Sequence, residues 1–91
     1  PALEEPADAL TPLRHHFPEW LARVPGSRVV DFGSGWGFQS VALARLGAEE
    51  VLALELGAEK RAFPEKAGLK NLRVRDRTEP GDLGTFDFVL S

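Results

Sequence analysis

The 91-residue sequence contains no cysteine, which excludes disulfide bonds, thiolate metal sites and a cysteine nucleophile. It also has no apolar run near the roughly 20 residues of a membrane-spanning helix, and no signal-like apolar segment opens it. Basic residues are in the minority, since 11 Lys and Arg face 14 Asp and Glu. These absences predict a cytoplasmic protein without membrane contacts, and they do not favour a surface that coats nucleic acid.

The composition that remains is that of one small globular domain. Hydrophobic residues make up 43% of the chain and charged residues 27%, and the length is too short for two independent cores. Residues 1–12 carry prolines and acids that predict an irregular arm, and residues 13–91 are predicted to form a single domain. Apolar residues over 13–24 recur at helical spacing, and Pro18 predicts that the helix begins there.

Further along the chain, strand-like and helix-like segments alternate. Apolar spacing predicts helices over 37–46 and 58–67, although Pro64 fits poorly inside the second one. This alternation of strands and helices predicts an α/β fold with a doubly wound, mostly parallel sheet of about four strands and helices on both faces. The strands are predicted over 28–32, 50–56, 71–75 and 86–90, and a polar loop over 78–84.

A glycine-rich loop follows the first predicted strand. Asp31 precedes Gly33-Ser34-Gly35-Trp36-Gly37, at the strand-to-helix junction where doubly wound sheets bind ligands. Glu55 closes the next strand, and an acid about 20 residues after such a loop can accept hydrogen bonds from both hydroxyls of a ribose. The pattern favours a nucleoside site. In the alternative interpretation the glycines form only a tight turn and Glu55 is a solvated residue at a strand end.

Two other kinds of site are disfavoured by the sequence. A dinucleotide fingerprint counted from Gly33 would need glycine at position 38, where the chain has Phe38, so a nicotinamide-dependent dehydrogenase is not favoured. His15 and His16 are adjacent and would point about 100° apart on a helix, and the chain has no third histidine. No metal site is therefore predicted.

Four segments together resemble one known family. VVDFGSGWG resembles motif I of the class I S-adenosylmethionine-dependent methyltransferases, and VLALE resembles their next strand with its ribose-binding acid. NLRVRD is similar to the segment whose Asp contacts the adenine amino group, and FDFVLS to the fourth strand. The resemblance covers residues 25–91, about the N-terminal half of the family's Rossmann-like domain. It implies methyl transfer with S-adenosyl-L-methionine as cofactor.

The resemblance also implies a role for each residue of the site. Asp31 and the loop would hold the methionine end of the cofactor, although Asp31 could equally tether the loop through backbone N–H groups. Leu56 could line the adenine or belong to the core, and Phe38 could line the methionine pocket or pack beneath the loop. The expected cofactor-binding residues are Asp31, Gly33, Ser34, Gly35, Trp36 and Gly37 at the methionine end, Glu55 at the ribose, and Leu56, Asp76 and Arg77 at the adenine.

The resemblance leaves the methyl acceptor and the catalytic residues unassigned, because the half of the domain that shapes the acceptor pocket is not matched. A small molecule, a protein and RNA all remain open. The order of Lys60-Arg61, Arg77-Thr78-Glu79 and FDFVLS resembles the small-subunit rRNA guanine-N7 methyltransferases, and Arg73, Arg75 and Arg77 alternate along one strand face, as either a solvated edge or a phosphate contact. The apolar fourth strand predicts self-association through an open sheet edge, and the alternative function is a non-catalytic or truncated module of that kind.

Overall fold

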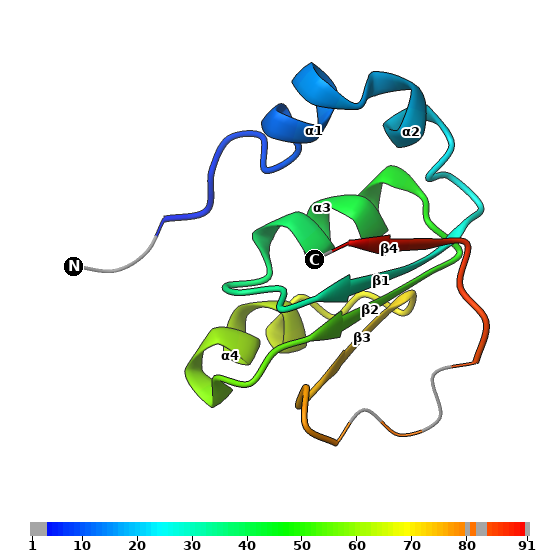
Figure 1. Cartoon of the computed structure of the whole chain (residues 1–91). Helices are drawn as coiled ribbons and strands as arrows, with labels where there is room; N and C mark the ends of the chain where they lie inside the picture. Colours follow the sequence, from blue (N-terminus) through cyan, green and yellow to red (C-terminus); the bar gives the residue numbers. More distant parts are fainter. Residues whose placement is uncertain (1–3, 80, 82–83, 91) are drawn as a thin grey trace.

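The computed structural model describes residues 4–79, 81 and 84–90. Its four strands form one parallel sheet in the order β3-β2-β1-β4 (Figure 1). The predicted α/β class and the four-stranded parallel sheet are thereby confirmed. In chain order the elements are α1 (Thr11–His16), α2 (Pro18–Ala22), β1 (Arg28–Phe32), α3 (Phe38–Leu46), β2 (Glu50–Leu54), α4 (Ala58–Lys66), β3 (Leu72–Arg75) and β4 (Phe88–Leu90).

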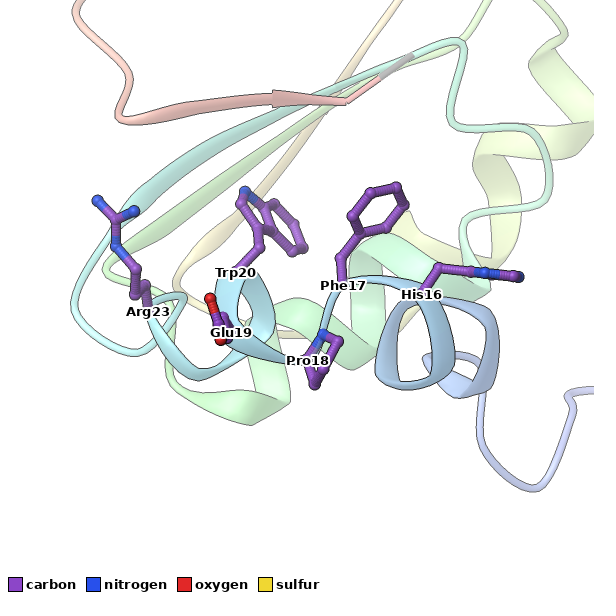
Figure 2. A pocket seen from close by; sticks show the side chains of 6 residues that line it. All are labelled: His16, Phe17, Pro18, Glu19, Trp20 and Arg23. Carbon is purple, nitrogen blue, oxygen red and sulfur yellow. The ribbon is translucent and has the colours of Figure 1, made fainter.

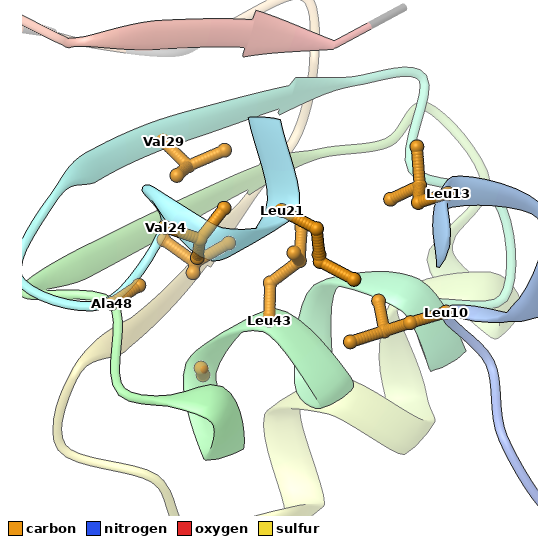
Figure 3. Close-up of a cluster of buried hydrophobic side chains, with 9 residues drawn as sticks. Leu10, Leu13, Leu21, Val24, Val29, Leu43 and Ala48 are labelled. Carbon is orange, nitrogen blue, oxygen red and sulfur yellow. The ribbon is translucent and has the colours of Figure 1, made fainter. Parts of the chain in front are cut away.

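The main core lies between the sheet and the helices α1, α2 and α3 (Figure 3). Val29 of β1 pairs in register with Val51 of β2 and Phe88 of β4, so these three side chains share one face of the sheet. Leu43 of α3 packs against this face and is fully buried. Because this core joins the helices to the sheet, neither layer would be stable alone.

The helices of the described chain lie on one face of the sheet, whereas helices on both faces were predicted. The β1-α3-β2 and β2-α4-β3 units step across the sheet in the same direction, and right-handed crossovers then place both helices on the same side. The opposite face presents Val30, Leu52 and Leu54, which pack against Phe86. The sheet order, which the alternation of elements does not reveal, decides this arrangement.

The N-terminal region contains two short helices instead of one. The helical conformation is interrupted at Phe17. The helix α2 begins at Pro18 as predicted, but a second short helix, α1, precedes it. Asp8 anchors the start of α1, since its Oδ1 accepts a hydrogen bond from the backbone N–H of Leu10 (2.9 Å) and its Oδ2 one from Arg14 Nε (2.8 Å). Leu10 is buried in the core, so the segment expected to be irregular through residue 12 is already packed there.

The remaining boundaries differ from the predictions by small amounts. The second strand ends at Leu54 instead of residue 56, and the fourth begins at Phe88 instead of residue 86. Residues 1–3 of the predicted arm, residues 80, 82 and 83 of the predicted loop, and Ser91 lie outside the described residues. Within the described part of the chain, no helix is both long and apolar enough to span a bilayer.

Candidate functional site

The carboxyl ends of three strands bring the predicted site together. Phe32, Leu54 and Arg75 are aligned in register as the last residues of β1, β2 and β3. The glycine loop leaves β1 at this edge, Glu55 and Leu56 leave β2, and residues 76–77 leave β3. Segments far apart in the sequence therefore meet along one edge, which is where parallel α/β sheets bind ligands.

The glycine loop depends on left-handed backbone conformations. Gly33, Gly35 and Gly37 have φ values of +70°, +60° and +82°, which side-chain-bearing residues rarely adopt. The backbone N–H groups of Gly33 and Ser34 both donate to the carbonyl oxygen of Leu54, at 2.8 and 3.0 Å. The loop is thus fixed to the end of β2 before it enters α3.

The glycines of the loop are needed for two different reasons. A Cβ on Gly37 would lie 2.5 Å from Cγ of Pro64, so this glycine permits close packing of α4. A Cβ on Gly35 would have no atom within 4 Å, which leaves the loop open on that side. Pro64, which fits poorly in a helix by sequence, is buried in α4 because its ring fills the space against the loop. The loop is therefore packed against α4 at Gly37 and open at Gly35.

Glu55 connects the loop to the exit of β2. Its Oε1 accepts a hydrogen bond from the Gly35 N–H and its Oε2 one from the Gly57 N–H, each at 2.8 Å. The Gly57 bond, joined by that of Gly35 and by the charge of Lys60, lowers the pKa of the Glu55 carboxyl although partial burial opposes this. The Glu55 carboxylate is therefore fixed in position by backbone hydrogen bonds and is not simply solvated. A carboxylate has about four acceptor positions, so lone pairs remain for a ligand.

Asp31 is bonded to side chains of α3 and not to the backbone N–H groups of the loop, which was one of the two expectations for it. Its side chain is 4% exposed, and Oδ2 accepts a hydrogen bond from the Ser40 hydroxyl of α3 at 2.6 Å. Burial raises the pKa of the Asp31 carboxyl, while hydrogen bonds from Ser40 and Gln39 oppose the rise. Asp31 thus joins β1 to the helix that follows the loop, and it supports the loop from beneath.

Asp76 is held in place at the exit of β3. Its Oδ1 accepts hydrogen bonds from the backbone N–H and the hydroxyl of Thr78, at 2.8 and 2.7 Å. These bonds, with the nearby Arg61 guanidinium, lower the pKa of the Asp76 carboxyl. Sequence reasoning did not predict Arg61 as a site residue. The available signal was its place early in the helix that follows Glu55.

Three apolar or aromatic side chains of the loop and its neighbouring segments, Leu56, Trp36 and Phe38, differ in their exposure and contacts. Leu56 is 56% exposed, so it does not belong to the core and could instead line a ligand. Trp36 is also exposed, and the Lys60 ammonium lies 5.7 Å from its ring centroid. Phe38 packs edge-on against Phe63 of α4, with ring centroids 5.0 Å apart, and therefore supports the loop from below.

The alternating arginines at positions 73, 75 and 77, in and just after β3, do not form a row of solvated charges. Arg73 Nε donates to Glu50 Oε1 at 2.6 Å, and Arg75 also has an interaction partner. The Arg77 guanidinium lies 5.9 Å from the centroid of the Phe32 ring and close to the glycine loop. The resemblance implied that Arg77 would accompany Asp76 at the adenine, but its side chain extends toward β1.

A separate hollow lies away from these residues. It has a volume of about 540 Å³ and occupies the side of α1 and α2 that faces β4 (Figure 2). A smaller apolar hollow of about 220 Å³ adjoins it and reaches Leu90. Neither includes a residue of the predicted site. The larger hollow is lined by His16, Phe17, Pro18, Glu19, Trp20 and Arg23.

The chain is similar in sequence and in structure to several known methyltransferases, although no family model matches it. The chain is 38% identical over 81 residues to magnesium-protoporphyrin O-methyltransferase of Rhodobacter capsulatus, covering 78% of this chain and 35% of that protein. It is 38% identical over 72 residues to ribosomal RNA small subunit methyltransferase G of Bacteroides thetaiotaomicron, covering 74% and 35%. A solved S-adenosylmethionine-dependent methyltransferase from Mesorhizobium loti matches 91% of this chain and 38% of its own, with a TM-score of 0.65 and 28% identity. The chain spans about a third of the length of these relatives.

Proposed function

Since the chain belongs to the class I S-adenosylmethionine-dependent methyltransferases, we propose that it binds S-adenosylmethionine at the carboxyl edge of its sheet. The observation that carries the proposal is the Glu55 carboxylate, which two backbone N–H groups fix beside the open side of the glycine loop. A carboxylate held in this way is preorganised to accept hydrogen bonds from the two hydroxyls of a ribose.

The other residues of the site fit the rest of the cofactor. Ser34 Oγ is buried and has no hydrogen-bond partner among the described residues, so a polar ligand group at the loop would satisfy it. This supports the methionine end of the cofactor at Gly33, Ser34 and Gly35. At the other end, exposed Leu56 offers an apolar wall and Asp76 an acceptor for adenine.

Within a complete enzyme, this chain would be the cofactor-binding portion. S-adenosylmethionine supplies a methyl group on a sulfonium sulfur. The residues at the carboxyl edge of the sheet would orient this sulfonium group toward an acceptor. The related proteins named above differ in acceptor, since one name specifies magnesium-protoporphyrin and another ribosomal RNA. We therefore leave the acceptor class open among small molecules, proteins and RNA.

Calorimetric titration of the purified chain with S-adenosylhomocysteine tests the proposal. We expect one molecule of ligand to bind per chain, and we expect NADH neither to bind nor to compete, because Phe38 stands where a pyrophosphate loop needs glycine. Folding of the sample is checked by circular dichroism. A folded chain that binds NADH but not S-adenosylhomocysteine would instead be a dinucleotide-binding module.

Self-association is a second candidate function, favoured by the edge strand β4. Val89 of this strand is 68% exposed, and an unpaired strand edge can pair with another chain. We expect the Val89→Lys variant to be monomeric in sedimentation equilibrium under conditions in which the original chain dimerises, because a charge on an edge strand opposes pairing. A monomeric original chain at every concentration would eliminate this candidate.

A further inference from the structure

Arg61 of α4 contacts the exits of two strands at once. Its Nη1 donates to the carbonyl oxygens of Glu55 (2.7 Å) and Leu56 (3.0 Å), and the same atom lies 3.6 Å from Oδ2 of Asp76. Only 17% of the side chain is exposed, so the guanidinium is largely removed from water at the junction of β2 and β3. A charged group in such a position requires several oxygen partners, and these three atoms supply them together with Oε1 of Glu65, 3.8 Å from Nε of Arg61.

The orientation of Asp76 depends on Thr78 on one side and on Arg61 on the other. Oδ1 receives both hydrogen bonds from Thr78, whereas Oδ2 faces the guanidinium. A separation of 3.6 Å is an ion pair and not a hydrogen bond, so Oδ2 keeps its capacity to accept an N–H from a ligand. Arg61 therefore orients this oxygen without occupying it.

The two carbonyl contacts hold the backbone at the exit of β2, as the contact with Asp76 does at the exit of β3. The backbone of residues 55–56 carries the exposed Leu56 side chain, and Arg61 holds this backbone from the direction of α4. Arg61 lies one helical turn from Pro64, whose ring abuts the glycine loop. One face of α4 thus contacts both the loop and the strand exits.

We propose that Arg61 is a positioning residue for adenine recognition, which sets Asp76 Oδ2 and the Leu56 wall at the separation that an adenine ring requires. This inference rests on the proposed function, because it assumes that the adenosine end of the cofactor lies at this edge. The Arg61 side chain suits the role, since its terminal nitrogen Nη1 faces oxygen atoms at the exits of both strands, and a lysine ammonium would replace part of these contacts.

The test compares two ligands that differ at the adenine amino group. S-adenosylhomocysteine carries this amino group, and S-inosylhomocysteine has a carbonyl in its place. We expect Arg61→Met to weaken binding of the adenosyl ligand about 10-fold, and Arg61→Lys to weaken it by less. For the inosyl ligand, which offers Asp76 no amino group, both variants are expected to change binding by less than about 3-fold. In the Asp76→Asn background, Arg61→Met is likewise expected to change binding of the adenosyl ligand by less than about 3-fold.

The control is Lys66→Met, which removes the same charge from an exposed position of the same helix and is expected to leave both affinities unchanged. Equal losses for the two ligands, or an undiminished effect of Arg61→Met in the Asp76→Asn background, would assign Arg61 a general structural role and overturn the proposal. It is also overturned if both Arg61 variants are unfolded by circular dichroism. If the original chain binds neither ligand, the proposed function fails too, whereas normal binding by a folded Arg61→Met variant removes only this inference.

Discussion

Replacing Gly37 with alanine is expected to lower the free energy of unfolding by about 4 kcal/mol, a large part of the roughly 5–15 kcal/mol of a typical domain. Two effects combine at this position. The φ of +82° is unfavourable for any residue with a Cβ, and that Cβ would lie 2.5 Å from Pro64 Cγ and 2.7 Å from Pro64 Cδ. Both atoms belong to a rigid ring inside α4, so the helix as a whole would have to move. Urea unfolding followed by circular dichroism measures the loss.

Gly35→Ala is the matched control for this prediction. Gly35 also has a positive φ, but a Cβ there meets no atom within 4 Å, so only the backbone strain of about 1 kcal/mol is expected. Adding Pro64→Ala to Gly37→Ala removes the two closest ring atoms and should restore part of the stability. If Gly35→Ala and Gly37→Ala destabilise the chain equally, packing against Pro64 is not what requires glycine at position 37.

Replacing Glu55 with alanine is expected to weaken S-adenosylhomocysteine binding by about 2–3 kcal/mol in a calorimetric titration. The variant loses the acceptor for the ribose, and it also loses the two hydrogen bonds that hold Gly35 and Gly57. Glu59→Ala, which removes an exposed acid from α4, changes the net charge by the same amount and should bind normally. Affinity of Glu55→Ala equal to that of the original chain would show that ribose does not contact this carboxylate.

The same carboxylate predicts a pH dependence of stability. The pKa of Glu55 is lowered by the Gly57 and Gly35 hydrogen bonds, so the folded state releases the proton more readily than the unfolded state does. Its contribution to stability is therefore complete above the ordinary glutamate pKa and is lost as the pH falls through the lowered folded value. The stability difference from Glu55→Ala should be largest near neutral pH and should diminish under acidic conditions.

The features that could be predicted from the sequence are those encoded by local patterns. The loop could be predicted because its glycines lie between a strand and a helix. Glu55 could be predicted because it is the acid at the end of the next strand, at the expected spacing within one βαβ unit. Arg61 and the contact between Gly37 and Pro64 were missed because they arise between elements. Pro64 by itself disfavours a helix over this segment. The contact between its ring and Gly37, which explains its presence in α4, is visible only after α4 has been placed.

Asp31 illustrates a different limit. Neither the burial of Asp31 nor its hydrogen-bond partner could be predicted from the sequence, because an acid before a glycine loop can turn toward the loop or away from it. The alternation of side chains along β1 places Asp31 on the same face as Val29, beneath α3, and there the Ser40 hydroxyl is its partner. The identity of that partner depends on how α3 lies over the sheet, which no spacing within β1 specifies.

The strand order β3-β2-β1-β4 also has a consequence for folding kinetics. The pairs of β1 with β2 and of β2 with β3 are joined by single crossovers, whereas β4 returns to β1, where the Arg28 backbone N–H meets the Asp87 carboxylate 59 residues away in sequence. Closing the longer loop costs more chain entropy, so we expect the first three strands to assemble before β4 docks. Amide hydrogens of β4 should then exchange with solvent faster than those of β1 and β2, through openings that leave the glycine loop intact.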